Sequence, residues 1–267
     1  MKGGMPMNTV TVKQVTDWLN AIAPFDTAEE FDNVGLLMGN PDAAVHNVCF
    51  GMDLTEKLAQ EALAMNAELI VTHHPVIFTP LRRIDYTTPQ GKTLCALAAA
   101  HVNVLAAHTN WDKAQGGVSD SLAQALDLRN VTSGDDYLRI GSLVVPQTAD
   151  ALSSRIERSL HFAPRRYGGG SASLSRVAVA GGSYGEGAAL AVTLGAQAFV
   201  VGEIKHHEVL DACARGLTVY EAGHFATELP GIAALYERFL ADAVKASWQV
   251  KAHLHFQAPY AGATLAL

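Results

Sequence analysis

The sequence predicts an α/β protein of two lobes, each built on a mostly parallel sheet covered by helices. Short apolar runs of strand character alternate with segments whose apolar residues recur every three or four positions. The same alternation recurs in the second half of the chain. Its 267 residues, 49% hydrophobic and 17% charged, suffice for one large domain or two modest lobes. We expect lobes at about residues 8–135 and 136–267, after a disordered leader, residues 1–7.

The first lobe is predicted to hold four helices and three strands. The Ala/Leu/Glu-rich helix has amphipathic spacing, and Asp53 with Glu56 fits a capping pair for it. In chain order the elements are a helix over Val12–Ala23, a turn at Asp32–Gly35, a strand at Asn47–Met52, a helix over Thr55–Asn66, a strand at Glu68–Thr72, a helix over Gly91–Ala100, a strand at Val102–Ala107 and a helix over Val118–Leu126.

The second lobe shows the same order of strands and helices, with a Gly/Ser-rich turn at Gly168–Ser173. Pro230 fits the first turn of a helix but not the interior of a helix that begins earlier. The predicted strands are Gly141–Val145, Arg176–Ala180, Ala198–Val201, Leu217–Glu221 and Trp248–Phe256, and the predicted helices are Ala149–Leu160, Gly187–Leu194 and Gly231–Val244.

Charge and hydropathy exclude several classes of partner. The formal net charge is -7, without a run of Lys or Arg, so we expect neither nucleic acid nor an anionic membrane as partner. No apolar stretch is long enough to span a bilayer, and the first residues, MKGGMPMNTV, do not resemble a signal peptide. These features predict a cytoplasmic protein.

The sequence has three cysteines without CxxC spacing, which is typical of reduced core residues, so a metal site would use histidine and carboxylate.

The segment LIVTHHPVIF, residues 69–78, places two histidines directly after a predicted buried strand. Because Pro75 favours a turn there, His73 and His74 can enter a cavity at the carboxyl end of the strand. Open α/β sheets bind their ligands at that edge. Taken in isolation, such a pair is more often one core histidine and one solvated histidine, so the rest of the chain has to decide.

Two further strand ends carry ligand-type residues. The run VNVLAA leads directly into HTNWD, which places His108 and Asp112 just past a strand. In LTVYEAGHFATE a strand is followed by His224 and Glu228, whose spacing of four puts both on one helical face. Taken singly, an HxxxE pair can be a surface pair. Three strand ends that each carry ligand-type residues, however, favour one shared site between the lobes.

The number of donors points to more than one ion. The five side chains are too many for an open single-metal site and suit two divalent ions with a bridging carboxylate. Nitrogen and oxygen donors suit zinc, iron, manganese, nickel or cobalt. Two such ions against two carboxylates leave about two positive charges, which favours a small phosphate-bearing substrate. The candidate ligands are His73, His74, Asp112, His224 and Glu228.

The chain resembles the Nif-three-like dinuclear metal-centre family, whose members are often labelled GTP cyclohydrolase I type 2 homologues. The resemblance begins near Val10 and continues to the end of the chain. It implies that the same five residues hold two metal ions, with Glu228 as the bridge. It also implies a toroidal homohexamer. The stretches that carry it are AEEFDNVGLLMG, DLTEKLAQEA, LIVTHHPVIF, AAHTNWDKAQGGVSDSLA, GGSYGEG, VGEIKHHE and EAGHFATELPG.

Other polar residues remain open to two interpretations. His108 is either a proton-transfer group beside the metals or a structural histidine. His207, with His206, follows a strand in a turn that either reaches the cavity or is solvated. The GGSYGEG loop is either a tight turn or a phosphate cradle. Asp32 and Asn33 of the FDNVG stretch are accounted for by turn formation.

These features together predict a two-metal hydrolase in which His108 or His207 moves protons. The substrate would be a nucleotide or another phosphate-bearing molecule, with a reaction like that of GTP cyclohydrolase or a phosphoesterase. The competing prediction is a metal-binding regulatory or interaction protein without catalysis, in which the protein saturates the coordination of the metals.

Overall fold

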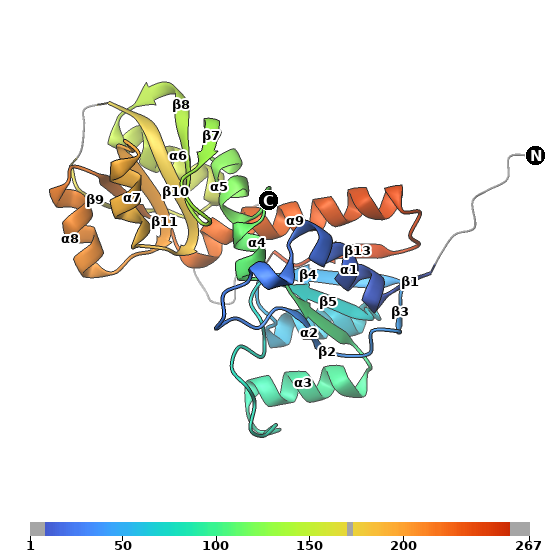
Figure 1. The fold of residues 1–267 in the computed structure, drawn as a ribbon. Coiled ribbons are helices and arrows are strands. Elements are labelled where there is room, and N and C mark those ends of the chain that lie inside the picture. The colour runs from blue at the N-terminus through green and yellow to red at the C-terminus, as the bar shows by residue number, and fades with distance from the viewer. Residues whose placement is uncertain (1–8, 170–172, 257–267) are drawn as a thin grey trace, which may run out of the picture. The chain divides into compact units, whose positions relative to one another are not determined.

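The structure, a computed structural model, describes residues 9–169 and 173–256 (Figure 1). These residues form two compact units: one runs to Ala114 and resumes at Ile232, and the other runs from Gln115 to Gly231. Each unit contains a sheet with parallel strands covered by helices, so the predicted α/β class is confirmed. The leader expected at residues 1–7 lies outside the described residues.

The first unit is built on a five-stranded sheet of order β13-β4-β5-β6-β2. Four strands are parallel and β2 is antiparallel at one edge. The strands are β2 (Gly35–Met38), β4 (Asn47–Gly51), β5 (Leu69–Thr72), β6 (Asn103–Ala106) and β13 (Lys251–Leu254), and a small pair joins β1 (Val10–Thr11) to β3 (Ala44–Val45). The helices are α1 (Val12–Ile22), α2 (Glu56–Ala64), α3 (Pro89–Ala99) and α4 (Thr109–Lys113), with a 3-10 turn at Phe25–Thr27.

The strands β5 and β6 are buried at every position because helices cover both faces of this sheet. On one face Ile70 and Val104 pack with Leu58 and Leu97 of α2 and α3. On the other face the ring of Phe50 meets that of Phe239, 5.2 Å away between centroids. The sheet is therefore fixed from both sides, and its carboxyl edge, where Thr72 pairs with Ala106, is held in register.

The second unit is built on a six-stranded sheet of order β7-β8-β10-β11-β12-β9. Only β10, β11 and β12 are parallel to one another, so this sheet is more mixed than the sequence predicted. The strands are β7 (Arg129–Ser133), β8 (Arg139–Gln147), β9 (Arg165–Tyr167), β10 (Leu174–Ser183), β11 (Ala198–Glu203) and β12 (Thr218–Glu221). The helices are α5 (Val118–Ala125), α6 (Ala149–Leu160), α7 (Gly187–Thr193), α8 (His206–Ala214) and the first part of α9 (His224–Lys245).

The division of the chain differs from the one expected near residue 135. The helix α5 packs on β10 and β8, and β7 pairs with β8, so both belong to the second unit. Conversely, the final helix contributes Leu235 and Phe239 to the first unit. No long linker marks this boundary: the chain crosses it once beside Gly116 and Gly117 and once inside α9.

The last helix was expected over Gly231–Val244, with Pro230 excluding an earlier start, and this expectation is wrong, because α9 starts at His224 and contains Pro230 in its interior. Proline removes one backbone hydrogen bond and costs about 3 kcal/mol in a helix interior. The helix offsets this cost by burying Phe225, Leu229 and Ile232 at helical spacing. At roughly 1.5–3 kcal/mol for each large apolar side chain, that burial exceeds the cost of the proline.

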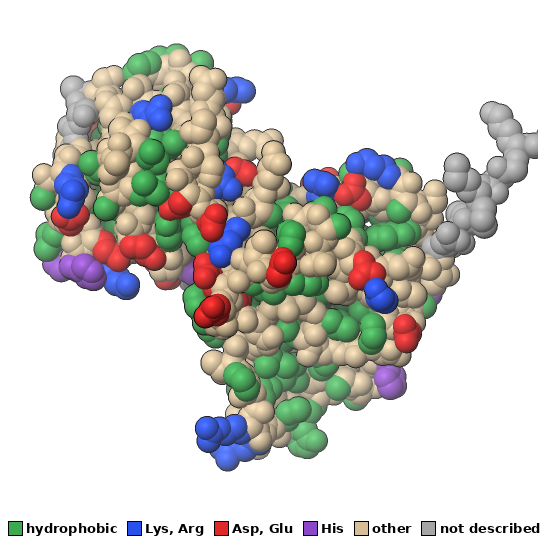
Figure 2. All heavy atoms as spheres, in the orientation of Figure 1, with side chains coloured by type: hydrophobic (Ala, Val, Ile, Leu, Met, Phe, Trp, Pro, Cys, Tyr) green, Lys and Arg blue, Asp and Glu red, His purple; other side chains and the backbone are tan. Residues whose placement is uncertain are grey.

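No described helix has the length and apolar character needed to cross a membrane. On the face shown in Figure 2, acidic and basic side chains are interspersed and hydrophobic ones are scattered among them.

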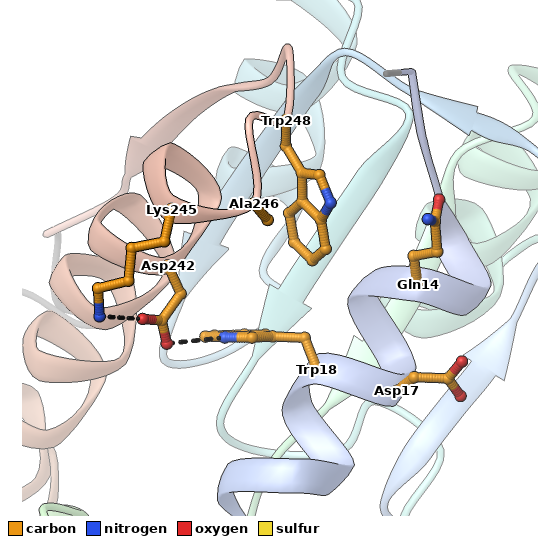
Figure 3. Close-up of a pocket in the computed structure, with 7 residues that line it drawn as sticks. All are labelled: Gln14, Asp17, Trp18, Asp242, Lys245, Ala246 and Trp248. Carbon is orange, nitrogen blue, oxygen red and sulfur yellow. Dashed lines mark hydrogen bonds and ion pairs between the residues drawn. The ribbon is translucent and has the colours of Figure 1, made fainter. Parts of the chain in front are cut away.

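A hollow of about 580 Å³ lies in the first unit between α1 and the end of α9. Figure 3 shows Trp18 and Trp248 in its wall, with the Trp18 ring directed toward Asp242. Trp18 Nε1 donates to Asp242 Oδ2 (3.2 Å), and Lys245 Nζ donates to Asp242 Oδ1 (2.7 Å). The hydrogen bond from Lys245, followed by that from Arg238, holds the pKa of Asp242 well below its usual range. Asp242 therefore links α1 to α9.

Replacing Asp242 with Asn should reduce the free energy of unfolding at pH 7 by about 1 kcal/mol, a value already discounted for solvent screening of the exposed Lys245. The pKa of Asp242 is lower in the folded state than in the unfolded state, where it is near 4. Ionised Asp242 therefore stabilises the protein fully above the unfolded-state pKa, and this stabilisation is lost as the pH falls through the folded-state pKa. The difference in stability between the two proteins, measured by urea titration, should therefore begin to shrink as the pH falls below about 4 and disappear only near the folded-state pKa.

Asp17→Asn is the matched control, since Asp17 lines the same hollow and, among the described residues, pairs with the exposed Lys13 at helical spacing and with no other cation. It should change stability by less than about 0.5 kcal/mol. A loss of stability in the Asp242→Asn protein that is the same at every pH would contradict the stabilising role of ionised Asp242.

Candidate metal centre

Three histidines of the first unit meet where β5 and β6 end. His73 and His74 follow β5, and His108 follows β6 by two residues. The backbone continues the sheet past the strands, because His73 N donates to Gly51 O and Ala107 N donates to Thr72 O. The ring centroids of His73 and His74 lie 5.0 Å apart, and His108 lies 5.2 and 5.3 Å from them. One ring nitrogen from each lies close enough to the others to share an ion.

Each of the three rings is held through Nδ1 by an oxygen acceptor. His73 Nδ1 lies 2.7 Å from Ala107 O, His74 Nδ1 lies 2.8 Å from Asp53 Oδ1, and His108 Nδ1 lies 2.8 Å from Asp32 Oδ1. A carbonyl or carboxylate oxygen can only accept, so Nδ1 carries the proton in each ring. The lone pair of the neutral imidazole is then on Nε2, which is the tautomer that a metal ligand requires.

Sequence reasoning missed both carboxylates of this arrangement. Asp53 was expected to cap α2, but that cap is Thr55, whose side chain accepts from Leu58 N (3.1 Å). Asp53 instead lies just past β4, the strand beside β5, and reaches the His74 ring. The signal was available in the sequence, because an acidic residue at the end of a strand can reach the end of the neighbouring strand.

Asp32 does more than form the turn that was predicted for it. Its Oδ1 atom accepts from His108, and its Oδ2 atom accepts from the backbone and hydroxyl of Thr109 at the start of α4. Burial raises the pKa of Asp32, but the hydrogen bonds from His108 and Thr109 outweigh it and bring the pKa well below its usual range. Asp32 is therefore a carboxylate that orients both the ring and the helix behind it.

The short helix α4 brings a carboxylate to the same place. Asp112 Oδ1 lies 3.4 Å from His73 Nε2, and the His73 side chain is only 1% exposed. Two donors bound at about 2.1 Å to a tetrahedral ion lie about 3.4 Å apart. The first unit thus gathers three of the five predicted ligands, His73, His74 and Asp112, with His108 beside them.

The other two predicted ligands lie together in the second unit. His224 Nε2 lies 3.1 Å from Glu228 Oε1, on the first turns of α9, and His224 Nδ1 lies 3.4 Å from Glu203 Oε2. Glu228 is 3% exposed. The predicted helical spacing of this pair is confirmed, although the helix that carries it is longer than expected.

The glycines of the GGSYGEG loop make room for Glu228 and for two neighbouring side chains, those of Glu208 and Tyr184. A Cβ atom on Gly182, where φ is +62°, would lie 2.3 Å from Glu228 Oε1. A Cβ atom on Gly185 would lie 2.1 Å from Glu208 Oε2, and one on Gly187 would meet the ring of Tyr184. The loop makes a turn between β10 and α7, and neighbouring side chains occupy the space that Cβ atoms at these glycines would need. Its alternative role as a phosphate cradle remains a prediction.

His207 lies exposed in the first turn of α8. In the described part of the chain it does not join His224 and Glu228 in a group that could hold an ion. Its predicted part in proton transfer remains a prediction.

The donor set fits a divalent metal of the zinc or iron type. It offers imidazole nitrogens and carboxylate oxygens, and the three cysteines are free thiols. The Nδ1 hydrogen bonds to Ala107, Asp53 and Asp32 are of the kind that orients metal-binding histidines.

Comparison with known protein families gives one match over most of the chain, to the model described as Duf34/NIF3 (NGG1p interacting factor 3), at residues 10–258. A relative from Clostridium perfringens, named "GTP cyclohydrolase 1 type 2 homolog", is 31% identical over 85% of this chain and 90% of its own length. A relative of the same name from Streptomyces coelicolor is 33% identical over 91% of this chain and 90% of its own length.

Solved structures show the same fold at lower identity. A Bacillus cereus protein related to NIF3 matches with a TM-score of 0.90 and 20% identity, over 94% of this chain and 98% of that one. A hypothetical protein from Staphylococcus aureus matches with a TM-score of 0.88 and 23% identity, over 95% and 99%.

Gly182→Ala should lower the affinity for zinc at least tenfold, because the new Cβ atom would displace the Glu228 carboxylate. Gly216→Ala is the control: its φ is +83°, and its Cβ atom would meet nothing within 4 Å. Both variants should lose about 1–2 kcal/mol of stability from the left-handed backbone. Zinc titration with a competing chromophoric chelator separates the two effects, and equal zinc affinity in both variants would contradict the role given to Gly182.

Proposed function

The chain belongs to the Duf34/NIF3 family, and from that premise we propose that it is a metal-dependent hydrolase acting on a nucleotide or another phosphate-bearing small molecule. The observation that carries the proposal is the group of three histidines whose Nδ1 atoms are all held by oxygen acceptors. The name shared by the relatives, GTP cyclohydrolase 1 type 2 homolog, supports a nucleotide as substrate.

The proposed centre holds two divalent ions, with zinc, iron, manganese, nickel and cobalt as the suitable metals. The five proposed ligands offer three imidazoles and two carboxylates, which is the number of donors that two ions with open positions need. Glu228 would serve as the bridging carboxylate, because a carboxylate has two oxygens that could each act as a ligand. The ligands are His73, His74, Asp112, His224 and Glu228.

The charge of this centre suits an anionic substrate. Two divalent ions against the carboxylates of Asp112 and Glu228 leave about two positive charges, which a phosphate group can neutralise. Bound divalent ions supply Lewis acidity, which polarises the group under attack and makes water more acidic.

The proton-transfer step is assigned to His108. Its Nδ1–H is held by Asp32, whose side chain is fully buried, so Nε2 is the atom that can accept a proton. When it does, the Asp32 carboxylate stabilises the imidazolium without itself taking the proton, as in other His–Asp pairs. Because Asp32 also binds Thr109, the ring is fixed to the start of α4 while the proton moves.

The proposal is tested by an activity screen of metal-reconstituted protein against GTP, cyclic and linear phosphodiesters, and phosphate monoesters. Turnover that disappears on chelation and returns with metal supports it. Metal-loaded protein that turns over none of these substrates would leave the non-catalytic regulatory function instead.

Individual ligand substitutions should remove different numbers of ions. His74→Ala and Asp112→Ala should each retain about one metal per chain, whereas Glu228→Ala should retain close to none, since loss of a bridging carboxylate affects both ions. Elemental analysis under matched metal exposure measures this. Two metals per chain in the Glu228→Ala protein would exclude the bridge.

The protein is also proposed to be a cytoplasmic homohexamer, in line with its free cysteines. Light scattering at micromolar concentration should give a mass about six times the 28.3 kDa of one chain. A mass of a single chain would refute the oligomer without affecting the metal centre.

A further inference from the structure

Two phenylalanine rings extend from the histidine group to the surface of the first unit. The Phe78 ring lies edge-on to the His108 ring, 6.1 Å away between centroids. The Phe31 ring lies 6.2 Å from the Phe78 ring. Exposure increases along this series, from the mostly buried His108 to Phe78 at 44% and Phe31 at 65%. The three rings form a continuous aromatic strip, defined here as Phe31, Phe78 and His108.

The strip is held by residues that also shape the centre. Phe31 immediately precedes Asp32, whose carboxylate binds both His108 and Thr109. The backbone before Phe78 is fixed on two sides, because Asn33 Nδ2 donates to Ile77 O and Gln90 Nε2 donates to Val76 O. The two exposed rings are therefore presented on anchored backbone, which lowers the entropic cost of using them for binding.

We propose that Phe31 and Phe78 are a stacking platform for a planar heteroaromatic ring, such as a nucleobase, on the substrate of this centre. The inference rests on the proposed function, because it places the phosphate of the same molecule at the metals. Every nucleobase has a π-face that can stack on an aromatic side chain, so the platform selects for a base without choosing among bases. It makes Phe31 and Phe78 substrate-binding residues rather than proton-transfer residues.

A small ligand fits the strip better than a second protein copy does. The planes of the Phe31 and Phe78 rings are tilted by 55°, so a planar base can stack on the face of one ring and contact the edge of the other, and the Phe78 ring is itself in contact with a candidate catalytic histidine. A protein partner would extend over the other exposed apolar residues of the same segment, Ile84 and Tyr86. Among the described residues neither of these has a ring contact with the histidine group, so they serve as controls.

The test is isothermal titration calorimetry of the zinc-loaded full chain with guanosine monophosphate and with ribose 5-phosphate, which has the same phosphate and sugar but no base. Phe31→Leu and Phe78→Leu keep an apolar side chain but remove the stacking surface. Each should weaken the binding of guanosine monophosphate about tenfold and change that of ribose 5-phosphate less than about twofold. Phe31→Trp should retain the affinity for guanosine monophosphate, and Tyr86→Leu should have no effect, since Tyr86 is 71% exposed on the same segment but outside the strip.

Three results would overturn the platform. The unaltered protein could bind the two probes with equal affinity, both leucine variants could bind guanosine monophosphate as well as the unaltered protein does, or the leucine variants could lose affinity for both probes equally. A shift in the light-scattering mass of the leucine variants would make the strip a subunit contact instead. Equal affinity for the probes leaves the proposed function standing, whereas failure of both probes to bind zinc-loaded protein overturns the platform and the proposed function together. Zinc content, measured in every variant, must match that of the unaltered protein.

Discussion

The candidate centre depends on three hydrogen bonds, one to the Nδ1 atom of each clustered histidine. Without them each imidazole would exchange between two tautomers and rotate, and only part of the population would present the nitrogen that a metal needs. The bonds to Ala107, Asp53 and Asp32 fix the tautomer before any ligand binds. The arrangement is possible only because these acceptors lie on segments that are themselves immobilised by the sheet and by α4.

The parallel sheet of the first unit supplies that immobility. Its strands β4, β5 and β6 end at the same edge, in register, so Asp53, His73 with His74, and His108 leave adjacent strands at the same level. Packing against helices on both faces prevents the strands from slipping by one residue, a shift that would reverse the direction of each histidine.

In the second unit a steric constraint positions the candidate ligands. The absence of a Cβ atom at Gly182 gives the Glu228 carboxylate its place beside His224.

The sequence allowed the strongly periodic elements and the grouping of the candidate ligands at strand ends to be predicted, but not the short exposed strands or the long-range partners of the histidines. The helices α1, α2 and α6 and the strands β4, β5 and β12 lie within one or two residues of their expected bounds, because burial and spacing determine them. The strands β7 and β9 were missed because they are short and largely exposed, so no alternation marks them. The prediction from Pro230 failed because the burial of apolar side chains along α9 outweighs the cost of a proline in the helix interior. Asp32 and Asp53 were assigned local roles, since their long-range partners His108 and His74 are visible only in the fold.

The most direct test of this account is the tautomeric state of the three histidines, read from long-range ¹H–¹⁵N correlation spectra of metal-free protein during a zinc titration. We expect His73, His74 and His108 each to carry a proton on Nδ1, and zinc to shift the Nε2 resonances of the metal-binding rings while the Nδ1 protons remain. A proton on Nε2 of His73 or His74 in the metal-free protein, or Nε2 resonances that do not respond to zinc, would contradict it.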